Sequence, residues 1–163
     1  MLTEEEIYIK MKKHLKNLGW TLLGGEPPGG TDFELRVIEM KGSDTGSSLG
    51  SKKIDLIGFK DNFFLLLELK KVYAESDIDK LNEICDSEIW RREFLHALEQ
   101  KHRLPPNLQT ENYTVNDDLL IKALGFNDTR KTGPEDFITF LVSDNDIQAH
   151  FGADIPQTIR DLF

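Results

Sequence analysis

Residues 52–71, KKIDLIGFKDNFFLLLELKK, constrain the fold more than any other part of this sequence. Residues 52–59 are rich in β-forming side chains, and residues 63–69 form an almost unbroken apolar run, which is typical of a strand buried on both faces. Asp61 and Asn62 lie between the two segments and favour a tight turn. The stretch therefore predicts two antiparallel strands joined by a two-residue loop.

The register of this hairpin brings charged side chains together. A two-residue loop places Asp55 opposite Glu68 and Lys53 opposite Lys70, with all four side chains on one face. Two carboxylates directly across a ladder repel each other unless a cation lies between them, and a hard divalent metal ion is the natural cation. The alternative is that these are solvated charges near the strand ends, but an apolar run surrounds Glu68.

Length and composition set the broad class. A chain of 163 residues with 39% apolar residues is expected to form one domain over residues 1–163. The one cysteine, Cys85, allows no internal disulfide and falls in a helical apolar pattern, so it is expected in the core. Because no secretory leader and no apolar span of about 18 residues is present, we expect a cytoplasmic protein without membrane contact.

The charge distribution limits the type of nucleic-acid binding. A formal net charge of -9 argues against a protein that coats nucleic acid through phosphate contacts alone, but it does not exclude local recognition. Lysines gather at both ends of the predicted hairpin, and a second basic group lies farther along the chain, although such groups are usually solvated helix faces. The candidate nucleic-acid contacts are Lys52, Lys53, Lys71, Arg91 and Arg92.

The N-terminal segment predicts an amphipathic helix. Thr3 and Glu6 have capping-box spacing. Glu4 lies at the N-terminal end of the buried stripe that follows, so it is either a favourable helix-dipole contact or a site residue. His14 lies near the same stripe and is expected to be structural. The stripe consists of Ile7, Tyr8, Met11, Leu15 and Leu18.

The remaining elements follow from turn residues and apolar spacing. They are a short extended piece at 20–23, a strand at 31–41, a mobile Gly/Ser loop at 42–51, a long helix from Asp77 toward His102 with a break near Asp86 and Ser87, a short helix at 116–124, strands at 137–143 and 146–151, and a last helix from Pro156. The loop at 42–51 lacks the Gly-Lys pair of a phosphate-binding loop, so no nucleotide site is predicted there.

The predicted order is a helix, three strands, a helix and a strand, with an acidic residue on the second strand and Glu-x-Lys on the third. Over roughly residues 3–143 this resembles the PD-(D/E)xK nuclease superfamily, which includes restriction endonucleases, archaeal Holliday junction resolvases and the nuclease domains of type I restriction R subunits. Glu-x-Lys occurs at 39–41, 68–70 and 99–101, and only the second shares a hairpin with Asp55. The resemblance implies an α/β (α+β) fold, a restriction endonuclease-like αβββαβ core in which helices flank a mixed central sheet.

The resemblance also implies the chemistry. Asp55, Glu68 and the carbonyl of Leu69 would hold Mg²⁺, for which Mn²⁺ can substitute, because Mg²⁺ takes oxygen ligands in near-octahedral geometry. Lys70 would orient the attacking water or offset charge in the transition state. Glu4 matches the glutamate that many members bring from their first helix.

Three functions are consistent with these residues. The first is a Mg²⁺-dependent DNA nuclease of the restriction, repair or defence type, acting alone, as a homodimer or in a larger nuclease assembly. The second is a non-catalytic interaction or regulatory subunit, which the acidic composition favours, as do Ile54 in place of the motif's proline and the lack of QxxxY at 72–79. The third is an RNA endonuclease, since viral cap-snatching enzymes use a similar core with a histidine from the first helix, here His14.

Overall fold

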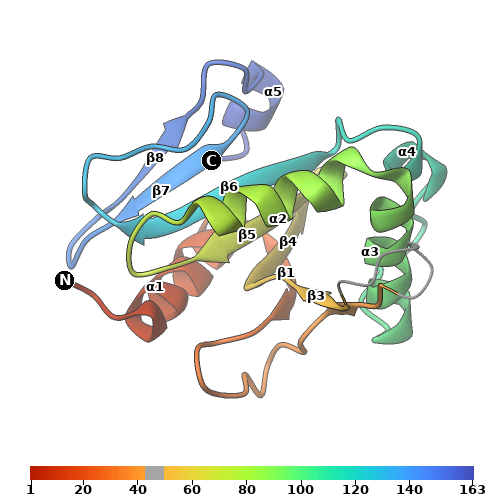
Figure 1. Ribbon diagram of the computed structural model, residues 1–163, viewed down its shortest axis with the longest axis horizontal. Helices are drawn as coiled ribbons and strands as arrows, with labels where there is room; N and C mark the ends of the chain where they lie inside the picture. Colours follow the sequence, from red (N-terminus) through yellow and green to blue (C-terminus); the bar gives the residue numbers. More distant parts are fainter. Residues whose placement is uncertain (43–49) are drawn as a thin grey trace.

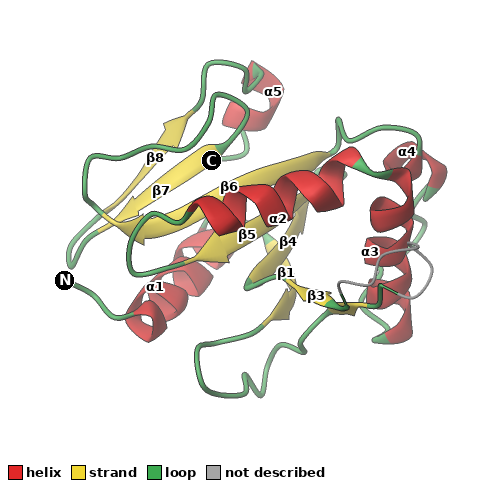
Figure 2. Cartoon of the chain, in the orientation of Figure 1, coloured by secondary structure: helices red, strands yellow, loops and turns green. Residues whose placement is uncertain are grey.

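A computed structural model of the chain, which describes residues 1–42 and 50–163, contains a six-stranded mixed sheet with helices on both faces (Figures 1 and 2). The outer pairs of neighbouring strands are antiparallel, and the two pairs that involve β6 are parallel. The predicted class, a mixed central sheet flanked by helices, is therefore confirmed. In spatial order the strands are β1 (Thr21–Gly25), β4 (Leu56–Lys60), β5 (Phe63–Leu69), β6 (Leu120–Asn127), β7 (Ile138–Val142) and β8 (Ile147–Phe151).

The β4–β5 hairpin forms the centre of this sheet. Lys60 pairs with Phe63, as a two-residue loop requires. Asp61 and Asn62 both have positive φ, at 49° and 69°, which is the conformation of a type I′ hairpin turn. The predicted turn and register are confirmed along the whole of β4.

Helices cover the two faces of the sheet. α1 (Glu4–Asn17) packs against one face, and α2 (Glu75–Asp86) and α3 (Glu88–Gln100) pack against the other. Because side chains alternate along β5, Phe64 and Leu66 lie in the core with α2 and α3, while Leu65 and Leu67 lie in the core with α1. Two short helices, α4 (Glu111–Thr114) and α5 (Gln157–Arg160), complete the helical elements of the described residues.

Local signals at the helix ends are confirmed. The Glu6 N–H donates to the Thr3 hydroxyl at 3.1 Å, and the Thr3 N–H donates to the Glu6 carboxylate at 2.7 Å, so the capping box begins α1. The predicted break between α2 and α3 lies at Ser87, whose hydroxyl accepts from the Trp90 N–H at 3.3 Å. Cys85 is buried as expected.

Two predicted elements are wrong. Residues 31–41 do not form a strand of the main sheet; β1 pairs with β4 instead, and only β2 (Glu39–Met40) is extended, paired with β3 (Lys52–Lys53) in a separate two-stranded sheet. The predicted helix at 116–124 is replaced largely by β6, which is buried along its whole length. Most of the predicted loop at 42–51 falls on residues 43–49, outside the described residues.

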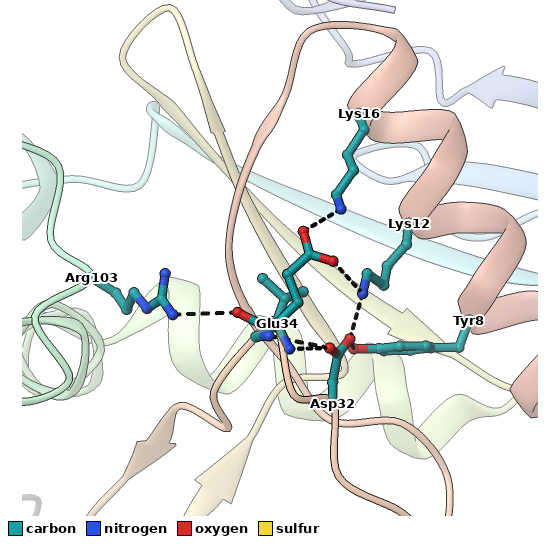
Figure 3. Close-up of polar contacts among 7 residues, drawn as sticks. Tyr8, Lys12, Lys16, Asp32, Glu34 and Arg103 are labelled. Atoms are coloured by element: carbon teal, nitrogen blue, oxygen red, sulfur yellow. Dashed lines mark hydrogen bonds and ion pairs between the residues drawn. The ribbon is translucent and has the colours of Figure 1, made fainter.

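A polar network explains why residues 31–35 turn rather than extend (Figure 3). One oxygen of Asp32 accepts from the backbone N–H groups of Glu34 and Leu35, a local turn that competes with strand formation. The other accepts from the Tyr8 hydroxyl at 2.8 Å and from the Lys12 ammonium at 2.6 Å. Asp32 thus attaches this loop to α1.

We expect Asp32→Asn to lower the free energy of unfolding at pH 7 by about 2 kcal/mol. Burial alone would raise the pKa of Asp32, but hydrogen bonds from Lys12, Tyr8 and the backbone lower it to about 2. A pKa below the unfolded value means that this stabilisation is present above about pH 4 and is lost as the pH falls toward 2. In urea unfolding, the difference between the two proteins should shrink by about half at pH 3.

The matched control is Glu34→Gln. Glu34 belongs to the same loop and pairs with Lys12 and Lys16, but its side chain is 55% exposed, so its removal should change stability much less. Equal losses in the two variants would contradict the structural role assigned to Asp32.

Candidate active site

Asp55 and Glu68 meet where β4 begins and β5 ends. The Asp55 N–H donates to the Glu68 carboxylate at 2.9 Å, and the Leu69 N–H donates to the Asp55 carboxylate at 2.8 Å. The backbone hydrogen bonds between β4 and β5 end at the pair Leu56 and Leu67, and these side-chain hydrogen bonds continue the contact between the two segments. The structure therefore brings together the two carboxylates that the sequence placed opposite each other.

The predicted pairing of Lys53 with Lys70 is wrong. The chain leaves the main sheet at residues 54–55, so Lys53 lies in β3 opposite Glu39. Its ammonium lies 3.5 Å from the Glu26 carboxylate. The predicted single strand at 52–59 is two short strands in two sheets, because the contacts of Asp55 with β5 run through the Asp55 and Glu68 side chains instead of backbone-to-backbone pairing.

Glu68 has a cationic partner that sequence analysis missed. Glu68 is 2% exposed, and its carboxylate forms an ion pair with the ammonium of Lys80, from α2. The same ammonium donates to the backbone carbonyl of Lys53 at 2.9 Å. Burial lowers the pKa of Lys80, although Asp55 and Glu26 act in the opposite direction. A protein lysine therefore neutralises this buried carboxylate.

The electrostatic state of Asp55 follows from the same surroundings. Burial raises its pKa, while the Leu69 N–H and the Lys80 and Lys70 ammonium groups act to lower it.

Asp77 is a further carboxylate near this pair, and it was not predicted. It lies in the first turn of α2, is 6% exposed and has no side-chain hydrogen bond or ion pair with the residues that the structure describes. Burial raises its pKa to about 6, with Lys70 lowering it and the charges of Asp55 and Glu4 raising it further. Its spacing contained a usable signal, because it precedes the buried Leu81 by four residues and thus lies on the buried stripe of the helix.

The two lysines that follow β5, Lys70 and Lys71, differ in exposure and in their contacts. Lys70 is half-buried, and its charge acts on Asp55 and Asp77, although it forms no ion pair with any described residue. Lys71 is exposed, and its backbone N–H lies 3.4 Å from the Glu4 carboxylate. Glu4 therefore reaches the end of β5 from α1, beside the residues that the resemblance groups with it.

An open pocket of about 600 Å³ lies beside Asp55 and Lys80. Lys52 and Lys53 line it, and the Lys52 ammonium lies 3.0 Å from Glu83 and 5.0 Å from the Trp90 ring centroid. These lysines border the acidic pair, and carboxylates partly neutralise them. The full lining is Glu26, Ser51, Lys52, Lys53, Asp55, Ser76, Asp79, Lys80 and Glu83.

Two candidate nucleic-acid contacts lie on α3, away from this lining. Arg91 is 7% exposed and donates to the carbonyls of Cys85 at 2.7 Å and Thr114 at 2.8 Å, so it is a structural residue and not a surface contact. Arg92 is exposed and pairs with Glu88 at 3.1 Å along the helix.

His14 is not part of the acidic site. Its ring lies 6.2 Å from that of Phe140 in β7, on the α1 face of the sheet, and burial lowers its pKa. Glu68 belongs to the opposite face, in line with Phe64 and Leu66.

The donor set contains hard oxygen ligands. Asp55 and Glu68 offer carboxylate oxygens. Because the N–H and C=O of a strand residue point to the same side, the Leu69 carbonyl faces Asp55, which precedes the first residue of β4. Such donors suit Mg²⁺ or Mn²⁺. Across residues 1–42 and 50–163 no cluster of three or more His, Cys, Asp or Glu side chains could hold a metal ion.

Comparisons of this chain with protein-family models, with curated proteins and with solved structures found no match. Among the described helices, none is long and apolar enough to span a membrane.

Proposed function

We propose that this protein is a nuclease that hydrolyses DNA phosphodiester bonds and depends on Mg²⁺ or Mn²⁺. One observation carries the proposal: the buried Glu68 meets Asp55 at the open end of the central hairpin, with Lys70 directly after β5 and an open pocket alongside. Charged groups inside a core cost stability, so their concentration at one sheet end indicates a functional site.

The order of elements supports the same class. Apart from the separate β2–β3 pair and the short α4, the order is a helix, three antiparallel strands, a helical pair and a parallel strand, as in the PD-(D/E)xK core. β1 takes the place that residues 31–41 were expected to fill. We infer a restriction endonuclease-like fold from this order and from the motif residues on β5. DNA is accordingly the proposed partner, bound by a homodimer or within a larger assembly.

Each residue has a proposed role. Asp55, Glu68 and the Leu69 carbonyl would hold the cation, which when bound supplies Lewis-acid polarisation of the phosphate and a more acidic water. Lys70 would orient that water and offset the negative charge that develops on the phosphate. Lys52 and Lys53 would contact the DNA backbone beside the scissile bond.

The test is Mg²⁺-dependent cleavage of duplex, branched and single-stranded DNA by the unmutated protein. Asp55→Asn should abolish cleavage, because it removes a charged ligand without changing side-chain volume. The control is Glu39→Gln, which alters another Glu-x-Lys sequence in the separate two-stranded sheet and should retain activity. Absence of cleavage on all three substrates, or equal loss in both variants, would reject the proposal.

A non-catalytic interaction or regulatory subunit is the second candidate. The observation that favours it is the ion pair of Lys80 with Glu68, which satisfies the buried carboxylate without a metal ion. This reading would be preferred if the unmutated protein cleaves nothing. The RNA alternative depends on His14, which packs against Phe140 instead.

A further inference from the structure

The contacts of Lys80 define how the carboxylate of Glu68 is neutralised. The ammonium forms an ion pair with Glu68, donates to the Lys53 carbonyl at 2.9 Å and lies within electrostatic reach of Asp55. To stay ionised, a carboxyl group that is 2% exposed requires a counter-charge, because an unpaired buried charge strongly disfavours the folded state. Lys80 supplies that charge from a different element of the fold, α2.

A divalent cation on Asp55 and Glu68 would need the same carboxylate oxygens. Two cations cannot share them, since like charges at contact distance repel strongly where water is scarce. Binding of the ion therefore requires Lys80 to move, or else Lys80 excludes the ion.

The surroundings of Lys80 allow that movement. Its side chain is 28% exposed, whereas that of Glu68 is 1% exposed, so the lysine alone has a path to solvent. The open pocket beside it contains the carboxylates of Glu26 and Asp79, which can accept the released ammonium.

We propose that Lys80 is a built-in counter-ion that occupies the cation site of Asp55 and Glu68 and is displaced into the adjacent pocket when a divalent ion binds. The two carboxylates would then be neutralised by Lys80 in the metal-free protein and by the divalent ion in the metal-bound protein. Competition from Lys80 would determine the affinity for the metal ion. The inference rests on the proposed function for the kind of cation, but its test uses cation binding without DNA.

The experiment is calorimetric titration of the full chain with Mn²⁺ alone. Lys80→Met removes the competing charge and keeps a side chain of similar length, so Mn²⁺ should bind at least about tenfold more tightly than to the unmutated protein. The matched control is Lys53→Met, which removes a charge from the same pocket but from a side chain paired with Glu26; we expect a change of at most about threefold.

A second measurement covers the case in which Lys80→Met does not fold, since it leaves Glu68 without a partner. The unmutated protein, labelled with ¹³C at the lysine ε-carbon, is titrated with Mg²⁺ and observed by NMR, with the Lys80 signal assigned from Lys80→Arg. The Lys80 signal should move toward that of a solvent-exposed lysine, while the Lys71 signal should not change.

Equal Mn²⁺ affinity in the unmutated protein and Lys80→Met, an equal gain in Lys53→Met, or a Lys80 signal that does not respond to saturating Mg²⁺ would overturn the proposal. A gain specific to Lys80→Met in a protein that cleaves no DNA would uphold the counter-ion exchange and reject only the nuclease. Failure of either proposal can therefore be recognised separately.

Discussion

Lys70→Ala is expected to lower Mg²⁺-dependent DNA cleavage by roughly 10³-fold while leaving the fold and cation binding nearly intact. A lysine donates no ligand to Mg²⁺, so its loss acts on the attacking water and on the transition-state charge rather than on the ion. The backbone of Lys70 donates to the Gly125 carbonyl at 3.0 Å, a bond that the substitution preserves. Initial cleavage rates at saturating Mg²⁺, with Mn²⁺ titration as the binding control, measure the effect.

Lys71→Ala is the matched control for this prediction. Lys71 is adjacent in sequence but exposed, whereas Lys70 is half-buried, so the two ammonium groups have different surroundings. We expect only a few-fold loss from it. Comparable losses in both variants, each falling steeply with added salt, would indicate general attraction to the DNA backbone instead of a catalytic lysine.

Asp77→Asn is expected to raise the free energy of unfolding at pH 8 by about 2 to 3 kcal/mol. Burial raises the pKa of Asp77 from 3.8 to about 6, and each pKa unit corresponds to about 1.4 kcal/mol. Because the folded pKa exceeds the unfolded one, the native state is favoured by protonation below about pH 4, and that advantage is lost as the pH rises through 6. Asparagine keeps the shape of the side chain and removes the charge.

Urea unfolding of both proteins at pH 4 and pH 8 measures this effect. The stabilisation should fall to about one fifth at pH 4, where the folded aspartate is protonated and the unfolded one is roughly half ionised. Asp79→Asn is the control, since Asp79 lies on the same helix but is exposed, and it should change stability little at either pH. A loss of stability at pH 8 in Asp77→Asn would show that the charged carboxylate has a stabilising partner.

A buried carboxylate that destabilises the native state is typical of a site selected for function rather than for stability. Asp77, Asp55 and Glu4 come from three different elements, and Lys70 acts electrostatically on the first two. Variants of Asp77 should therefore be assayed for cleavage beside those of Asp55. If an Asp77 variant is more stable than the unmutated protein, any activity that it loses is not caused by unfolding.

The sequence by itself determined the elements whose signals are local. Asp61 and Asn62 define a turn, because they lie between two apolar runs and both suit positive φ. This turn sets the register of β4 with β5. The capping box of Thr3 and the break at Ser87 depend on side chains within three residues of the groups they satisfy. The pairing of Asp55 with Glu68 followed from the same register.

Only the tertiary structure decided the contacts between distant segments. Lys53 pairs with Glu39 rather than Lys70, and residues 120–124 of the predicted helix belong to the buried strand β6. Arg91 turns inward to the carbonyls of Cys85 and Thr114. Lys80 likewise reaches Glu68 from another element. Each contact depends on how whole elements pack, because a buried polar group takes whichever partner the completed fold brings within reach, and spacing along the chain does not contain that information.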